Sequence, residues 1–320
     1  MKRKLAWMIL ALGAFAIGMA HAQEYPSKPV RIVVPFAPGG GSDFIGRFIA
    51  QKLSERLGQQ FIVDNRPGAG GNLGAEIALK SAPDGYTLLL IAGSYTVNPS
   101  LYKPTFDAVN DITPIIQLSQ GPFIVAVHPS LPVKSLKELI DLAKKQPDKL
   151  SYASAGQGSI THLASELFLD MAKIKIVHIP YKGTGPALND AIAGNVQLIF
   201  GSVATSLQYI KSGRLRGLGV TTSKRISAAP ELPTVAEAGV PGYEVILWHG
   251  LIGPKAMPKA IVDRLNSEAG QILKSKAMEE LLAADGVSPA GGTPEKFHAT
   301  IKTDIERWRK VVQQAGIKAE

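Results

Sequence analysis

Short apolar runs alternate along the chain with stretches in which apolar residues recur every three or four positions. The run at 31–36 is followed by a glycine-rich turn and then by a helical period through Phe44, Phe48 and Leu57. Strand, helix and strand in this order form a βαβ unit, which predicts a parallel sheet with right-handed crossovers. Further strands are expected at 60–64, 87–91, 123–127, 150–153, 175–179, 197–200, 215–221 and 245–251.

The alternation occurs in two blocks and ends in helices. In the second block, helices are expected at 159–171 and 186–193, and Ser135 with Glu138 forms a capping box before another helical period. A final helix is expected to begin around Pro294 and to run through Trp308. Two such blocks predict an α/β protein with two similar doubly wound lobes and crossings near 128–129 and 241–242.

The N-terminus has a different pattern. Lys2, Arg3 and Lys4 precede an uncharged and mostly apolar stretch at 5–20, and Ala20-His21-Ala22 has the small residues of a cleavage site. The stretch is short for a bilayer core of about 30 Å. We therefore expect a cleaved signal peptide at 1–22 rather than a membrane anchor, and a periplasmic location.

Composition narrows the classes of function. The chain has 320 residues, of which 45% are hydrophobic and 19% are charged, so it can bury a core without cross-links. It has no cysteine, which excludes disulfides, thiolate metal sites and cysteine nucleophiles. Without the three leader cations, the formal net charge falls from +9 to +6, and the remaining basic residues are scattered. This balance favours small anionic ligands over nucleic acid.

Two glycine-rich loops each lie between a predicted strand and a predicted helix. They are Gly39-Gly40-Gly41-Ser42-Asp43 and Ser154-Ala155-Gly156-Gln157-Gly158-Ser159. Glycine allows close backbone approach, and a helix start offers unpaired N–H groups and partial positive charge. Either loop alone could be a simple tight turn. Two matched loops at the carboxyl ends of strands predict a cradle for a carboxylate that needs no arginine.

The motifs of these loops and of the surrounding chain resemble one family. They are YPSKPVR at 25–31, PFAPGGGSD at 35–43, DNRPGAGG at 64–71, PDGYTL at 83–88, SAGQGS at 154–159, YKG at 181–183 and LPT at 232–234. In this order they are similar to the Bug family, the extracytoplasmic solute receptors of tripartite tricarboxylate transporters. The resemblance covers essentially the whole mature chain. Gly46 departs from it, since the family usually has alanine there.

The resemblance implies a type II periplasmic-binding-protein fold. Lobe 1 would comprise 23–126 and 245–320, lobe 2 would comprise 127–244, and the lobes would close on the ligand. It also implies that the chain is not an enzyme, needs no cofactor or metal, and delivers its ligand to the transporter's membrane components. We expect a monomer and favour a dicarboxylate ligand. The residues expected to bind ligand are Phe36, Gly39, Gly40, Gly41, Ser42, Asp43, Gly93, Ser94, Ser154, Ala155, Gly156, Gly158, Ser159, Tyr181 and Asp190.

Several residues allow other interpretations. His162 and Glu166 have metal-ligand spacing, but a histidine supporting the second loop is the simpler hypothesis. Ser159 with His162 could serve a hydrolase, although no G-x-S-x-G elbow is present. Asp43 would repel an anion, so we expect it to orient its loop or a water molecule. We expect Trp248 to lie in the core. A ligand-sensing receptor for a sensor kinase remains an alternative to transport.

The loop at 68–74 resembles a dinucleotide fingerprint with one residue too many. Such a site requires an acidic residue about 20 positions later, after the next strand. Asp84 instead precedes that strand. We therefore expect the loop to be structural or to line the cleft.

Overall fold

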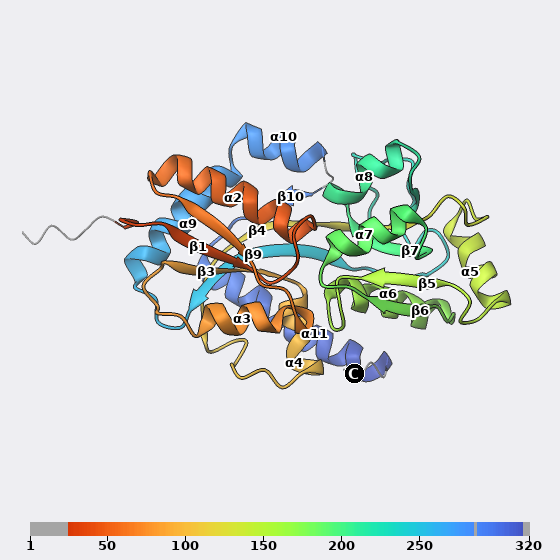
Figure 1. The fold of residues 1–320 in the computed structure, drawn as a ribbon, viewed down its shortest axis with the longest axis horizontal. Helices are drawn as coiled ribbons and strands as arrows, with labels where there is room; N and C mark the ends of the chain where they lie inside the picture. Colours follow the sequence, from red (N-terminus) through yellow and green to blue (C-terminus); the bar gives the residue numbers. More distant parts are fainter. Residues whose placement is uncertain (1–24, 285–286, 316–320) are drawn as a thin grey trace, which may run out of the picture.

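The computed structural model describes residues 25–284 and 287–315, and its strands form two sheets that share β4 (Ile112–Val127) (Figure 1). We call each sheet, with the helices packed on it, a lobe. The predicted signal peptide at 1–22 lies outside the described residues. Within 25–284 and 287–315, no helix is both long and apolar enough to cross a bilayer.

The first lobe is built on parallel strands. β1 (Val30–Val34) lies between β2 (Phe61–Asn65) and β3 (Thr87–Ala92) and is parallel to both. The helix α2 (Gly41–Leu57) connects β1 to β2, which confirms the predicted βαβ unit. β9 (Ile246–Pro254) is antiparallel to β3 and β4, and β10 (Ser288–Pro289) pairs with β4.

The second lobe has the same plan. β5 (Ser151–Ser154) is parallel to β6 (Val177–Pro180) and to β7 (Leu198–Ser202). β7 and β8 (Arg216–Val220) are antiparallel to β4. Three helices follow the parallel strands in turn, namely α6 (Ile160–Ala172), α7 (Thr184–Ala193) and α8 (Val203–Lys211). The predicted α/β class is therefore confirmed in both lobes.

β4 connects the two sheets. Its residues 112–122 pair with β9, whereas residues 123–127 pair with β7 and β8. The predicted strand at 123–127 was therefore too short. Prolines and polar residues interrupt the apolar pattern before Phe123, and two register shifts in the pairing with β9 accommodate them. The predicted lobe boundaries at 126/127 and 244/245 stay a prediction.

The remaining helices complete both lobes. They are the 3₁₀ helix η1 (Ala69–Gly71), α3 (Asn72–Leu79), α4 (Ser94–Leu101), α5 (Leu136–Lys145), α9 (Lys259–Leu273), α10 (Lys276–Ala284) and α11 (Pro294–Ala315). Ser135 caps α5 as predicted, because its hydroxyl accepts a hydrogen bond from Glu138 N–H. The Glu138 carboxylate accepts a hydrogen bond from the N–H of Lys134 and not from that of Ser135, as a capping box would require. The donor is therefore one residue earlier than predicted.

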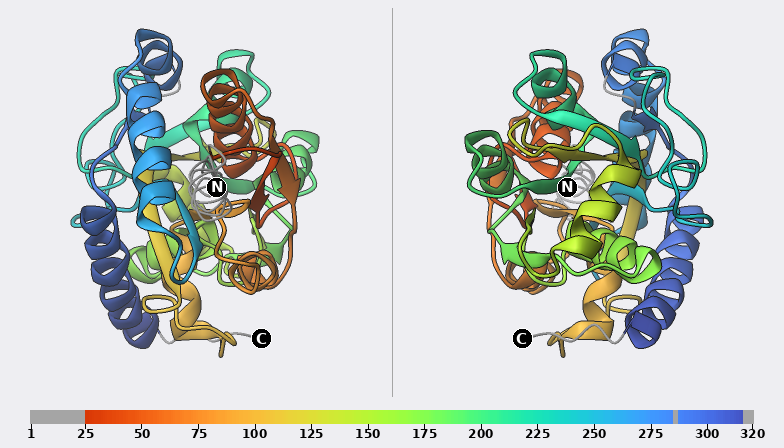
Figure 2. Two further views of the ribbon diagram at one scale, coloured as in Figure 1. Left: turned by 90° about the vertical axis from the view of Figure 1, so that its left-hand side faces the viewer. Right: turned by 90° about the vertical axis from the view of Figure 1, so that its right-hand side faces the viewer.

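α11 begins at Pro294 as predicted and runs along one side of the molecule, next to α4 (Figure 2). Phe297 and Ile301 pack into the first lobe with Trp248, whereas Trp308 and Val312 pack into the core of the second lobe. Trp248 is buried, and its indole N–H donates to Asp304 at 2.6 Å. The core role predicted for Trp248 is therefore confirmed, and α11 joins the two lobes on the side where β4 and β9 cross.

Candidate functional site

A narrow cavity lies between the lobes. Its volume is about 30 Å³, room for about one or two water molecules, because the lobes touch around it. Ala37 N–H donates to Lys182 O across the gap at 2.9 Å, and Tyr102 OH donates to Gln157 O at 2.8 Å. The lining residues are Phe36, Gly40, Gly41, Ser42, Ala92, Phe123, Ala155, Ser159, Ile160, Thr161, Thr184, Ser202, Leu247 and His249.

Helix N-termini converge on this cavity. α2, α6, α7 and α8 begin at or beside lining residues, and α4 begins two residues after the lining residue Ala92. The N-cap residues of α2, α4 and α7 are glycines, which have no side chain to cap the helix. The N-cap residue of α8 is Ser202, and its side chain makes no cap hydrogen bond. First-turn N–H groups without a cap need another acceptor. A helix start with partial positive charge is suited to bind an anionic oxygen.

The lining is uncharged. Within the part of the chain that the structure describes, the lining has no lysine, arginine, aspartate or glutamate, and His249 is its one titratable side chain. Burial lowers the pKa of His249 to about 4, so the ring is neutral at pH 7. Positive potential in the cavity therefore comes from the backbone, which gives a site that can hold an anion without a cationic side chain.

Asp43 fixes the conformation of the first-lobe loop through hydrogen bonds. Its carboxylate accepts hydrogen bonds from Gly39 N–H at 3.0 Å, from Arg47 Nε at 3.0 Å and from Asn65 Nδ2 at 3.0 Å. Burial alone would raise the pKa of Asp43, but these bonds bring it below its usual value. The prediction that Asp43 orients its loop is confirmed. Asp43 is not among the lining residues of the cavity and instead lines an outer groove with residues of α2, α7 and α8.

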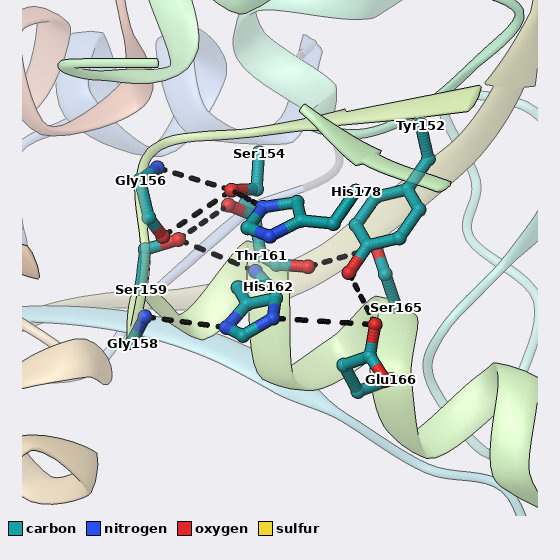
Figure 3. Close-up of polar contacts among 10 residues, drawn as sticks. All are labelled: Tyr152, Ser154, Gly156, Gly158, Ser159, Thr161, His162, Ser165, Glu166 and His178. Carbon is teal, nitrogen blue, oxygen red and sulfur yellow. Dashed lines mark hydrogen bonds and ion pairs between the residues drawn. The ribbon is translucent and has the colours of Figure 1, made fainter. Parts of the chain in front are cut away.

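The second-lobe loop is held from behind by two histidines (Figure 3). Gly158 N–H donates to His162 Nδ1 at 3.2 Å, and Ser154 Oγ lies 2.6 Å from His178 Nε2. The two rings stack with centroids 4.1 Å apart. Burial lowers the pKa of His162 to about 4, and burial together with His162 lowers that of His178 to about 3. His162 therefore supports the loop, as predicted.

The polar network continues behind the histidines. Tyr152 OH donates to Glu166 Oε1 at 2.5 Å, and His162 Nε2 lies 4.0 Å from the same oxygen (Figure 3). Burial raises the pKa of Glu166 despite the bond from Tyr152. Among the described residues, no cluster of three or more histidines and acids could hold a metal ion.

Ser159 is the N-cap of α6, as the loop's position suggested. Its hydroxyl accepts from His162 N–H at 3.2 Å and lies 3.0 Å from Thr161 Oγ1. The His162 Nδ1 atom that a hydrolase would direct at Ser159 instead accepts from Gly158 N–H. This arrangement gives Ser159 the role of a helix cap and not that of a nucleophile activated by His162.

The structure brings only part of the predicted set into the lining. Phe36, Gly40, Gly41, Ser42, Ala155 and Ser159 lie in it. Ser154, Gly156 and Gly158 make hydrogen bonds within the second lobe instead, and Gly39 and Asp43 line the outer groove. Gly93 and Ser94 begin α4 beside Ala92, and Tyr181 OH donates to Asp190 at 2.6 Å, away from the lining. Ligand contact by any of these residues stays a prediction.

Other lining residues were not predicted. Thr161 and Thr184 lie in the first turns of α6 and α7, and Ser202 ends β7 at the start of α8. His249 comes from the middle of β9. Thr161, Thr184 and Ser202 are hydroxyl residues that follow predicted strands, and this position in the sequence could have indicated them. The loop at 68–74 lies where the two lobes meet. Asn98 Nδ2 donates to Gly70 O, and a Cβ at Gly70 would lie 2.6 Å from Gln157 O in the other lobe. That the loop is structural or lines the cleft for a ligand stays a prediction.

Comparison with known proteins identifies the family to which the chain belongs. Residues 45–317 match the family model described as "Tripartite tricarboxylate transporter family receptor". Protein BugT of Bordetella pertussis is 37% identical over 300 residues, which cover 93% of this chain and 92% of BugT.

Solved structures agree in fold. A structure titled "R. palustris Rpa4515 with adipate" has a TM-score of 0.90 and 38% identity, and the match covers 93% of this chain and 100% of that one. Periplasmic binding protein BugD has a TM-score of 0.89 and 34% identity over 92% of this chain and 100% of BugD. MatC from Rhodopseudomonas palustris, with bound malate, has a TM-score of 0.86 and 30% identity over 90% of this chain and 100% of MatC. The chain therefore belongs to the Bug family of solute-binding receptors of the tripartite tricarboxylate transporter type, which are receptors and not enzymes.

Proposed function

We propose that this protein captures a small carboxylate, preferably a dicarboxylate, in the periplasm and delivers it to the membrane components of a tripartite tricarboxylate transporter. The observation that carries this proposal is the set of uncapped helix starts around an uncharged cavity. One carboxylate would bind the first-turn N–H groups of α2, with the hydroxyls of Ser159 and Thr161 on the opposite side.

The ligands of two relatives support the choice of substrate class. Rpa4515 was solved with adipate and MatC with malate, and both ligands are dicarboxylates. The expected leader at 1–22 and the likeness to a periplasmic binding protein support the periplasmic location.

Closure follows from the position of the site. Gly41 and Ser42 belong to the first lobe, whereas Ser159 and Thr161 belong to the second. A ligand that contacts both lobes stabilises the closed state relative to the open one. Because the closed cavity is only about 30 Å³, the lobes must separate to admit an organic acid. β4, β9 and α11 join the lobes and would carry this motion.

A thermal-shift screen tests the proposed function. The mature protein is refolded to remove carried-over ligand and mixed with adipate, malate and succinate, and with the neutral dimethyl ester of each. A ligand at 100 times its dissociation constant adds about 2.7 kcal/mol to the free energy of unfolding, which raises the melting temperature by several degrees. We expect a shift with at least one acid and none with its ester. The proposal is wrong if the folded protein shifts with no acid.

Ser159→Ala is expected to weaken carboxylate binding about 5- to 30-fold, the effect of losing one hydrogen bond to a charged group. It should also lower the free energy of unfolding by about 1 kcal/mol, because α6 loses its cap. Titration calorimetry and urea unfolding measure the two effects. Ser135→Ala is the matched control, since it removes the cap of α5, whose cap residue lies outside the cavity lining. Equal affinity in both variants would remove Ser159 from the site.

A further inference from the structure

His249 lies where the cavity meets the strands that cross between the lobes. It is in β9, opposite Ser119 of β4, and the residue is 3% exposed. The neighbouring Trp248 points to the other face of the sheet, toward α11. Neither the family comparison nor the two glycine loops gives a role to His249.

Both ring nitrogens of His249 face hydroxyl groups. Nδ1 lies 3.1 Å from Ser119 Oγ, and Nε2 lies 3.2 Å from Ser42 Oγ in the first turn of α2. A serine hydroxyl can donate or accept. The same two partners can therefore satisfy a neutral ring, which has one donor and one acceptor, and a protonated ring, which has two donors.

Among the described residues, the surroundings of the ring contain no counter-charge. The described neighbours that line the same cavities come from elements that include α2, β3, β4, β7, β9 and α10 and from the segment after α10, and all of them are uncharged. They include Gly41, Ser42, Phe44, Ile45, Ala92, Ser119, Phe123, Ser202, Leu247, Leu282 and Val287. The next residue along α2, Asp43, has its carboxylate bonded to Gly39, Arg47 and Asn65. Protonation of His249 would therefore be matched by a charge that a ligand brings.

A second negative charge in this cavity needs compensation. Each helix N-terminus supplies only a fraction of a positive charge, and a second full negative charge buried in the cavity is stabilised further by a group that can become cationic. Among the described residues, the lining has no lysine or arginine, and His249 is its one titratable group.

We propose that His249 takes up a proton when a dicarboxylate binds, and that this makes it the residue that favours dianions over monoanions. This inference rests on the proposed function. The proton comes from solvent and forms the second N–H of the ring, and it returns to solvent when the ligand leaves. The neutral state of the buried ring in the ligand-free structure, with its pKa at about 4, agrees with this cycle. A nearby carboxylate raises the pKa of an imidazole.

Proton uptake provides a direct test. Binding of adipate, malate and succinate, and of their monomethyl esters, is measured by calorimetry at pH 6.0 and 7.5 in buffers of different ionisation heat. The first carboxylate of a dicarboxylic acid raises the pKa of the second, so a part of each ligand carries its own proton at pH 6.0. The proton count and the affinity are therefore corrected with a titration of the free ligand. We expect close to one proton taken up per dicarboxylate at pH 6.0, and affinity about 10-fold higher at pH 6.0 than at pH 7.5. The monoesters should take up almost none and show less than a 3-fold change.

His249→Gln keeps a donor and an acceptor near Ser42 and Ser119 but cannot take up the proton. It should reduce the pH effect on dicarboxylate affinity to less than 3-fold, and it should lower the ratio of dicarboxylate to monoester affinity at pH 6.0. The proton count is measured on the wild-type chain and does not depend on this variant folding. Binding without proton uptake overturns the role of His249 and leaves the proposed function standing. No binding of any acid at either pH overturns both.

Discussion

Replacement of Gly41 by valine is expected to lower carboxylate affinity at least 100-fold, about 3 kcal/mol, while the protein still folds. Gly41 is the first residue of α2 and lines the cavity. A Cβ at this position would lie 2.9 Å from Ser202 Oγ in the other lobe and 4.0 Å from His249 Cε1. The added methyl groups would fill a cavity of about 30 Å³ and cover the N–H groups at the helix start.

The substitution brings no backbone strain, because Gly41 is not among the glycines with positive φ. The clash is with an atom of the opposite lobe, so it opposes closure more than it opposes folding of the first lobe. We therefore expect the melting temperature of the unliganded variant to stay within a few degrees of wild type. Gly41→Ala should give an intermediate loss of affinity, since it adds one carbon only.

The measurement is the thermal shift with the acid that stabilises wild type most, among adipate, malate and succinate. Gly270→Val is the matched control. It adds the same side chain to a helix, α9, where the nearest atom to a Cβ is Ile116 Cδ1 at 3.9 Å. The control should bind like wild type. A folded Gly41→Val protein that also binds like wild type would exclude the start of α2 from the site.

The sequence predicted the parallel parts of the fold well, because their strands are short, apolar and followed by helical periods. β4 was only partly predicted. Its first eleven residues include Pro114, Gln117 and Ser119, which interrupt any apolar run. They form a strand because β9 pairs with them across the molecule, and that pairing joins residues more than 120 positions apart. Such long-range pairing leaves little local pattern.

The sequence indicated the cavity-lining residues that belong to glycine-rich turns before helices. It did not indicate those that reach the cavity through tertiary packing. A glycine-rich turn before a helix is a local signal, and Gly40, Gly41, Ser42 and Ser159 follow from it. His249 lies in an apolar run, and the Ser42 hydroxyl that faces it is 207 positions away in sequence. The hydrogen bonds of Ser154 and Gly158 to histidines behind the loop also depend on packing, so sequence alone did not predict them.

The unliganded protein is expected to lose stability steeply between pH 7 and pH 5. His162 and His249 are buried and neutral, with pKa values lowered to about 4 from 6.5 in an unfolded chain. As pH falls below 6.5, the unfolded chain binds protons that the native state does not, so the free energy of unfolding decreases. Each group should contribute about 2 kcal/mol of loss between pH 7 and pH 5.

Other groups set the net size of this loss. His178, with its pKa lowered to about 3, acts in the same direction. Glu166 and Asp304 act in the opposite direction, because their raised pKa values let the native state bind protons before the unfolded chain does. Asp43 and Asp64 have lowered pKa values and lose their contribution below about pH 4, outside this range. We therefore expect a net loss of at least about 2 kcal/mol from pH 7 to pH 5.

Urea unfolding at pH 7, 6 and 5 measures this loss of stability. Variants of single histidines show how much each ring contributes to it. His249→Gln should reduce the loss by about 2 kcal/mol, because it removes one group that the unfolded chain protonates. His162→Asn should do the same while its amide oxygen replaces Nδ1 as the acceptor for Gly158 N–H. The change that each variant causes at pH 7 is the reference, because little proton binding by the histidines contributes there. A wild-type protein whose stability is constant from pH 7 to pH 5 would mean that the native state binds protons over the same pH range as the unfolded chain. His249 would then be largely protonated at pH 6.0 before the ligand arrived, and the proposed proton uptake at that pH would have no basis.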